Sequence, residues 1–384
     1  MKIAFVSISE NENNKKTWSG TIYKSYMSIK TVFPDTTFIS AANQNDFLGK
    51  ILVKFWLNLP RFLNKPLCMG DTLYAKRLYS KKLKKINFDK YDAIFVSGYA
   101  VIVASLPTTK TPIIYLSDAP FSALINYYPE NTNLLKWNEI TGNWISKKAF
   151  KRSKTCILSS EWAKKAVISD YKIETSKLKV IEFGANIEDE YLPSHPLLLN
   201  DKIKQKNEIN LLLVGVLWSR KGGDVAAECC LELNKKGYNT TLHIVGMKIP
   251  DKYCNYSSIK GYGFYDKDNP DEYKKYVELI SKMDVFLFPS KAECSSIALC
   301  EAAGFGLPAI SYETGGTPNY IVNGINGYML SLDSTGNDFS NKIIEIIEKN
   351  ELDTLSKGAK ELYNTKLNWD IWSQKVKLLL KESV

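Results

Sequence analysis

The stretch AECSSIALCEAAGFGLPAI, residues 292–310, decides how the second half of this chain folds. The residues before it, MDVFLFPS (283–290), are rich in β-branched and aromatic side chains and end in Pro-Ser, which predicts a strand. Ser295 and Ser296 can cap a helix over IALCEAA, and GFGLP ends that helix before a second strand begins at 308. The order strand, loop, helix, loop, strand is typical of a parallel α/β unit.

Two carboxylates frame this stretch: Glu293 lies in the loop before the predicted helix, and Glu301 lies on the helix. Eight residues of helix rise about 12 Å, a span that would reach from a sugar across a diphosphate to a ribose. The backbone N–H groups of Ser295, Ser296 and Ile297 are the unpaired donors that would bind the diphosphate. The alternative is that a serine only caps the helix and that Glu301 is exposed. The apolar neighbours of Glu301 argue against this, because a carboxylate among them needs a partner.

A second candidate anion site follows the predicted strand NLLLVGV (210–216), where LWSRKGGD leads into a helix. Arg220 and Lys221 stand beside two glycines at the helix start, an arrangement typical of a phosphate site. The alternative is a surface turn with solvated charges. Neither the Walker pattern GxxxxGK[ST] nor GxGxxG occurs, which disfavours a P-loop nucleotide site and an NAD site.

The 384 residues predict two domains, and strands alternating with helices in both halves predict doubly wound parallel sheets. A polar, Pro-containing stretch at 188–208 is interpreted as the linker. In such sheets a ligand binds at the carboxyl ends of the strands. In the first half, Gly20 in TWSGTIY and Asp118 in LSDAP stand at such ends; the alternatives are an ordinary turn for Gly20 and a helix cap for Asp118.

The charge is distributed unevenly along the chain. Residues 1–200 carry 28 Lys and Arg against 17 Asp and Glu, whereas residues 201–384 carry 23 against 24. The excess indicates either a solvated surface or attraction to an anionic surface or acceptor. The segment 47–65 interleaves apolar and basic residues, as in a helix that rests on anionic lipid or in a core helix with exposed lysines. No RRM, KH or helix-turn-helix pattern occurs, so nucleic acid is not an expected partner.

Other features narrow the chemistry and the compartment. No apolar run approaches about 18 residues, and MKIAFVSISE predicts a first strand, so a cytoplasmic protein, soluble or peripheral on the membrane, is expected. Seven scattered cysteines without CxxC pairs predict buried thiols and no zinc site. His243 lies in mid-strand and is interpreted as a packed core residue. A glycosidase is disfavoured, because its two carboxyl groups flank one bond and need no phosphate site.

Five segments follow one another along the chain: WSGT, SSEWAKKAV, LKVIEFGANIE, LLLVGVLWSRKGGD and the run from 284 to 330. Together they resemble the retaining GT-B glycosyltransferases of family 4. The likeness covers nearly the whole chain and is most specific over 210–330, where E-x7-E, a G-x-P strand start and GG…NG-x-NG follow one another. The resemblance implies an α/β GT-B fold with two Rossmann-like lobes facing each other across a cleft. Residues 1–195 would bind the acceptor, 205–365 the nucleotide-sugar donor, and the helix 366–384 would cross back to the first lobe.

The resemblance also implies roles for the candidate residues. Glu293 would contact the donor sugar near the reacting centre, and Glu301 would hold the ribose. Lys221, with Arg220 beside it, would hold the diphosphate together with the amides of 295–297. Electrostatic stabilisation of the leaving diphosphate would be the main catalytic contribution.

In the first half, Gly20 would lie close to the donor phosphates, and Asp118 would act on the acceptor side. No cofactor or metal is implied; a nucleotide-diphosphate sugar is the donor substrate, and a hexosyl group would pass to a glycan, lipid-linked or protein-linked acceptor. The implied pathway is bacterial surface polysaccharide or glycoconjugate synthesis.

The sequence departs from the family pattern at several positions. Val216 stands where many members have Arg, Asn319 replaces a Glu, and Cys294-Ser295-Ser296 replaces Gly-Phe-Gly. Asp118 stands about where many members have His. A non-catalytic GT-B subunit that binds a partner transferase or a glycan therefore stays open, as does a nucleotide-sugar epimerase, although only two histidines occur in the chain.

Overall fold

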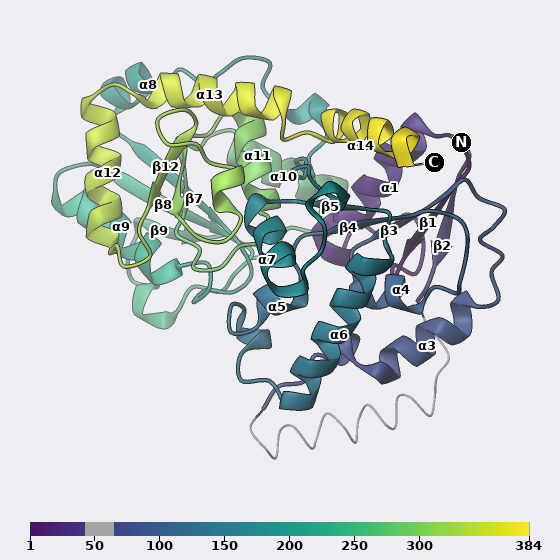
Figure 1. Cartoon of the computed structure of the whole chain (residues 1–384). Coiled ribbons are helices and arrows are strands. Elements are labelled where there is room, and N and C mark those ends of the chain that lie inside the picture. The colour runs from purple at the N-terminus through teal and green to yellow at the C-terminus, as the bar shows by residue number, and fades with distance from the viewer. Residues whose placement is uncertain (43–64, 384) are drawn as a thin grey trace. The chain divides into compact units, whose positions relative to one another are not determined.

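Strands and helices alternate along the described chain, as the apolar runs predicted. The computed structural model describes residues 1–42 and 65–383, and Figure 1 traces them. It divides into unit 1, Met1–Ile181 with Trp372–Val384, and unit 2, Glu182–Ile371. The boundary therefore precedes the stretch 188–208 that the sequence indicated as a linker. That stretch belongs to unit 2, where the amide of Leu199 donates to Asp353 Oδ1 at 2.6 Å.

Unit 1 is built on a six-stranded parallel sheet in the order β2-β1-β3-β4-β5-β6. Its strands are β1 (Ile3–Ser7), β2 (Thr36–Ser40), β3 (Ala93–Ser97), β4 (Ile113–Ser117), β5 (Thr155–Leu158) and β6 (Leu178–Val180). Its helices are α1 (Thr21–Val32), α3 (Leu73–Leu83), α4 (Ala100–Ser105), α5 (Phe121–Leu124), α6 (Lys136–Arg152) and α7 (Glu161–Tyr171). The central strands are buried on both faces, which explains their continuous apolar runs.

The last helix, α14 (Trp369–Ser383), begins in unit 2 and continues in unit 1 from Trp372 onward. The Trp372 ring is fully buried and meets the Phe95 ring of β3 edge to face, with ring centroids 6.2 Å apart. The prediction that the C-terminal helix returns to the first lobe is confirmed for these residues.

Unit 2 is built on a second six-stranded parallel sheet in the order β12-β11-β10-β7-β8-β9. Its strands are β7 (Ile209–Val214), β8 (Thr240–Val245), β9 (Ile259–Gly261), β10 (Val285–Phe288), β11 (Ala309–Tyr312) and β12 (Gly327–Leu330). Its helices are α8 (Leu199–Lys206), α9 (Gly223–Lys235), α10 (Pro270–Ile280), α11 (Ile297–Phe305), α12 (Gly336–Glu348) and α13 (Leu352–Thr365).

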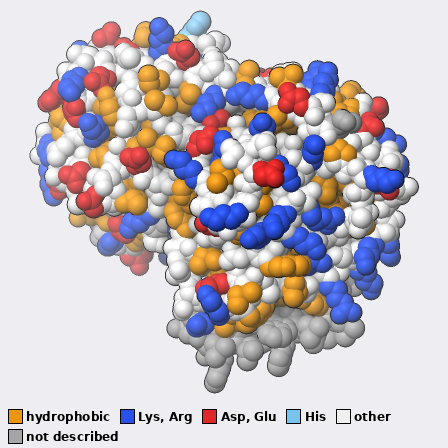
Figure 2. Space-filling model, in the orientation of Figure 1, with side chains coloured by type: hydrophobic (Ala, Val, Ile, Leu, Met, Phe, Trp, Pro, Cys, Tyr) orange, Lys and Arg blue, Asp and Glu red, His pale blue; other side chains and the backbone are white. Residues whose placement is uncertain are grey.

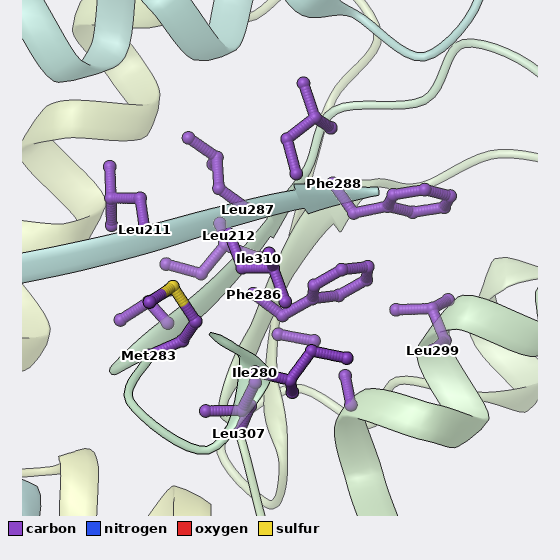
Figure 3. Packing of buried hydrophobic residues seen from close by; sticks show 14 of the residues in the cluster. Leu211, Leu212, Ile280, Met283, Phe286, Leu287, Phe288, Leu299, Leu307 and Ile310 are labelled. Atoms are coloured by element: carbon purple, nitrogen blue, oxygen red, sulfur yellow. The ribbon is translucent and has the colours of Figure 1, made fainter. Parts of the chain in front are cut away.

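The opening stretch of sequence forms β10, α11 and β11, and their packing positions the site. Ser296 caps α11 by accepting from the Leu299 amide, and Gly306, at φ 71°, ends the helix in the left-handed conformation that favours glycine. Figure 3 shows Leu299 pointing from α11 toward the sheet, where Phe286 of β10 is buried. Burying one such side chain contributes about 1.5–3 kcal/mol, so the apolar contacts fix where the helix begins.

Candidate functional site

The order of strands in unit 2 reverses between β7 and β10. From β7 the chain adds β8 and β9 on one side, and β10, β11 and β12 then extend the sheet on the other side. Loops that leave β7 and β10 at their carboxyl ends therefore diverge and leave a crevice, where open α/β sheets bind their ligands. The loop 215–222 follows β7 and the loop 289–296 follows β10, so both predicted anion-binding segments stand at this point.

Three charged side chains from these loops meet at one carboxylate oxygen. Glu293 Oε1 lies 2.6 Å from Lys221 Nζ and 3.0 Å from Arg220 Nη1. Ser290 Oγ donates to the same oxygen at 2.5 Å. The structure therefore brings the cation pair and the first carboxylate of E-x7-E into direct contact. The sequence analysis used Ser290 only as the end of a predicted strand. Its position at the end of β10, where the strand order of the sheet reverses, is the signal that would have predicted it as a site residue.

Lys221 is held in a site that disfavours its charge. Its side chain is buried, and its Nζ lies 4.4 Å from the centroid of the Phe288 ring. Burial lowers the pKa of Lys221, the neighbouring charge of Arg220 lowers it further, and Glu293 opposes both effects. A buried ammonium with one carboxylate and a second cation beside it can accept another anionic group.

Backbone contacts hold the two loops against each other. Gly222 has φ +70°, and a Cβ atom there would stand 2.0 Å from the carbonyl oxygen of Pro289. The Lys291 amide donates to Arg220 O at 2.8 Å, and the Gly316 amide donates to Glu293 O at 2.8 Å. Only glycine fits at 222, because both the left-handed backbone and the close approach exclude a side chain.

The start of α11 lies directly after Glu293. The Ser296 hydroxyl accepts from the Leu299 amide, and the first intrahelical bond runs from Cys300 to Ser296 O. Helix geometry gives the amides of Ile297 and Ala298 no intrahelical acceptor. These donors, with the partial positive charge of the helix end, suit an anion. The sequence analysis predicted that the amides of Ser295, Ser296 and Ile297 bind the diphosphate. In the structure Ser296 is the N-cap of α11 and Ser295 precedes it.

Glu301 has protein partners that the sequence did not predict. It is buried on α11, with Oε1 2.6 Å from Lys267 Nζ and Oε2 accepting from Tyr276 OH at 2.8 Å. Burial raises the pKa of Tyr276 and the charge of Glu301 raises it further. The expectation that this carboxylate needs a partner is confirmed. Lys267 lies in a loop and Tyr276 on α10, and no pattern in the sequence links either to Glu301.

The first-half candidates lie at the carboxyl ends of strands in unit 1. Gly20 caps α1 with φ 84°, and Trp18 and Ser19 before it have φ 52° and 54°. Asp118 follows β4, and its Oδ2 accepts from Trp18 Nε1 at 3.3 Å. Burial raises the pKa of Asp118, and the Trp18 hydrogen bond opposes this shift. Consecutive residues in the left-handed region cost energy and are frequent at functional sites.

Two other predictions are resolved by the structure. His243 is buried, with Nδ1 2.8 Å from Tyr262 OH and Nε2 3.1 Å from Asn210 Oδ1, which agrees with a packed core residue. The prediction of buried thiols is wrong for two of the seven cysteines, because Cys254 is exposed and Cys68 is half-buried. Cys68 directly precedes the short helix Met69–Asp71, and Cys254 directly follows the short helix Asp251–Tyr253, so neither lies within a core strand or helix.

Within residues 1–42 and 65–383, no group of three or more His, Cys, Asp or Glu side chains could hold a metal ion. None of the helices in these ranges has the length and apolar character that a membrane span requires. The predicted lipid-contacting segment 47–65 lies outside this range except for its last residue.

Solved structures define the class of fold. Over its full length the chain is similar to Anabaena HepE, crystallised with UDP, at 16% identity and a TM-score of 0.66 with all of both chains covered. It is similar to the sucrose-phosphate synthase of Thermosynechococcus elongatus at 15% identity and a TM-score of 0.68, covering 99% of this chain and 98% of the other. The chain therefore has the GT-B fold.

Sequence comparison adds the family. Residues 198–362, most of unit 2, match the family described as glycosyl transferases group 1. The chain is also 23% identical over 304 residues to an uncharacterised 41.2 kDa protein in the cps region of Klebsiella pneumoniae, covering 74% of this chain and 79% of the relative.

Proposed function

We propose that this protein is a retaining glycosyltransferase that moves a hexosyl group from a nucleotide-diphosphate sugar to a glycan, lipid-linked or protein-linked acceptor. The observation that carries the proposal is the contact of Arg220 and Lys221 with Glu293 at the strand reversal of unit 2. This contact lies inside the segment that matches glycosyl transferases group 1. A structural neighbour solved with UDP supports a nucleotide donor.

In this proposal the diphosphate binds between the cation pair and the start of α11. Lys221 and Arg220 supply the charge, and the amides of 295–297 supply directed donors. In the structure Glu293 contacts both Arg220 and Lys221. The diphosphate replaces part of this contact when it binds, and the Glu293 carboxylate turns toward the donor sugar. Glu301 accepts from the ribose hydroxyls with the lone pairs that Lys267 and Tyr276 leave unused.

The proposed transfer balances without a further reactant. The bond between the sugar C1 and the diphosphate oxygen breaks, and a bond from C1 to the acceptor oxygen forms on the same face. The acceptor proton passes to the departing diphosphate, whose charge Lys221 and the helix amides stabilise. Asp118 and Gly20 in unit 1 are the residues proposed to serve the acceptor and the donor phosphates. We propose that no metal ion is needed, so activity should survive chelation by EDTA.

The acceptor and the pathway are proposed more broadly. The relative in a cps region of Klebsiella pneumoniae supports a role in bacterial surface polysaccharide or glycoconjugate synthesis. The positive charge of the first half agrees with an anionic acceptor or with a peripheral position on the cytoplasmic face of the membrane.

The proposal is tested with UDP-, GDP- and ADP-sugars. A thermal-shift panel identifies the nucleotide, and release of nucleoside diphosphate without acceptor then reports donor cleavage. Lys221→Ala and Glu293→Gln should each abolish turnover while the protein stays folded. Lys235→Ala, an exposed lysine at the other end of α9, is the matched control and should turn over normally. Full turnover in Lys221→Ala, or no shift with any nucleotide, would reject the assignment.

A further inference from the structure

A groove of about 1230 Å³ lies in unit 1, away from every residue given a role so far. Its walls come from α3, from the C-terminal turns of α6 and from the segment 104–113 that leads into β4. Residues 153 and 154, just before β5, also line it. The groove therefore lies at the amino ends of β4 and β5. Asp118 follows the opposite, carboxyl end of β4, so the groove is distinct from the edge where the substrate is proposed to bind.

The groove is lined by positive charge. Its lining residues include eight cations and, within the described residues, no Asp or Glu: Lys76, Arg77, Lys84, Lys110, Lys148, Arg152, Lys154 and Lys177. Figure 2 shows Lys and Arg side chains gathered over the part of unit 1 that contains α4 and α6. For none of these eight does a carboxylate of the described residues lie within ion-pair distance. Eight cations of unit 1 thus line one groove without an ion pair to a described carboxylate.

Several of these cations are fixed in place. Arg152 donates to the carbonyl oxygens of Val103 and Leu106 at 3.0 and 2.8 Å, at the end of α4. Lys148 Nζ and Lys76 Nζ lie 4.9 and 6.0 Å from the ring centroid of Trp144. Burial lowers the pKa of Lys76, and three neighbouring lining cations lower it further. Holding like charges together costs energy that an anion in the groove would recover.

The rest of the lining indicates the chemistry of the occupant. Hydroxyl side chains also line the groove, but most of them are engaged within the protein. The hydroxyls of Ser105, Thr111 and Ser153 donate to backbone carbonyl oxygens, and that of Thr109 donates to Asp89 Oδ1 at 2.6 Å. The remaining polar groups are ammonium and guanidinium donors, which suit phosphate oxygens. No aromatic side chain lines the groove in the described residues, so it offers no ring on which a nucleobase would stack. A concave wall of this size fits a ligand with several linked phosphates better than a single ion.

We infer that this groove is a binding site for a ligand that presents several phosphate groups, separate from the nucleotide-sugar site. The ligand is either a free phosphate-bearing molecule or the headgroups of an anionic lipid, which share this chemistry. The inference does not depend on the proposed transfer reaction.

Binding of inorganic tripolyphosphate, measured by isothermal titration calorimetry, tests the site. The titration uses the full chain carrying Lys221→Ala, so that the unit 2 cations do not dominate the signal. Adding Lys76→Gln with Lys148→Gln should raise Kd about tenfold, since two charge-assisted contacts are lost. Lys76→Arg with Lys148→Arg should keep the affinity. The matched control, Lys165→Gln with Lys179→Gln, removes the same charge from exposed positions of unit 1 and should leave Kd unchanged.

Vesicles separate the two sources. Phosphatidylcholine vesicles with and without phosphatidylglycerol are sedimented with the same variants. Lipid headgroups are identified as the ligand if the protein binds anionic vesicles, the groove variant does not, and tripolyphosphate displaces the protein from the vesicles. A free ligand is identified if the protein binds tripolyphosphate but not the vesicles. Equal losses in the groove variant and the matched control would overturn the inference, as would no binding of either probe to the wild-type groove.

Discussion

Replacing Lys221 by Met and Glu293 by Gln, singly and together, gives the most detailed prediction. Removing one partner of a buried ion pair costs about 3–5 kcal/mol when the remaining charge is left alone. Lys221→Met leaves Glu293 with Arg220 at 3.0 Å and Ser290 at 2.5 Å, so we expect a smaller loss of about 1–2 kcal/mol. Glu293→Gln leaves the buried Lys221 and the half-buried Arg220 without their carboxylate, so we expect a loss of about 2–4 kcal/mol. The loss of stability in the double variant should be about 1–2 kcal/mol smaller than the sum of the losses in the two single variants.

The assay is urea unfolding of the four proteins, with and without UDP. Because the neutral amide in Glu293→Gln competes less strongly for the cations than the carboxylate does, UDP should stabilise this variant more than wild type. It should stabilise Lys221→Met less than wild type, because the diphosphate has lost its buried ammonium. The reasoning is refuted if the effects of the two substitutions on stability simply add. It is equally refuted if UDP stabilises Lys221→Met as strongly as wild type.

Other residues give sharper tests of single features. Because burial lowers the pKa of Lys221 below its ordinary 10.5, UDP affinity should fall as pH rises toward that value, in titrations from about pH 7 upward. Burial lowers the pKa of His243 from 6.5 to about 4, so its neutral form stabilises the fold above pH 6.5, and stability falls as pH drops toward 4. This loss should be about 2 kcal/mol at about pH 5 and should shrink in His243→Gln. Gly20→Ala should cost about 1 kcal/mol because of its φ of 84°, whereas Gly70→Ala, with open space around it, should cost little. Wild type should bind UDP about tenfold more tightly than 2′-deoxy-UDP, and Glu301→Gln should lose that preference.

The fold could be predicted from the sequence because the signals that end each strand and helix lie within a few residues of the boundary they specify. The strand before Pro289, the serine cap at 296 and the glycine at 306 each specify an element boundary, and apolar runs buried on both faces specify a parallel sheet. The unit boundary was misplaced because a polar stretch with prolines, 188–208, resembles a linker even when its amides are tied to Asp353.

The candidate site was predictable where its residues stand at strand ends. Lys221 and Glu293 were found because each follows a strand and precedes a helix, and the strand reversal brings them together. Lys267 and Tyr276 were not, because only the fold of α10 and the loop before it brings them to Glu301. The basic groove of unit 1 was invisible as a site, since its cations come from segments spread over more than half of that unit. The sequence showed only the excess of charge.

A crystal structure of the chain with a bound nucleoside diphosphate tests the central claim most directly. The account predicts phosphate oxygens within about 3 Å of Lys221 Nζ and of a backbone amide among residues 295–297. It also predicts that Glu293 has given up part of its contact with the cations. Phosphates bound elsewhere, with Glu293 still holding both Arg220 and Lys221, would contradict it.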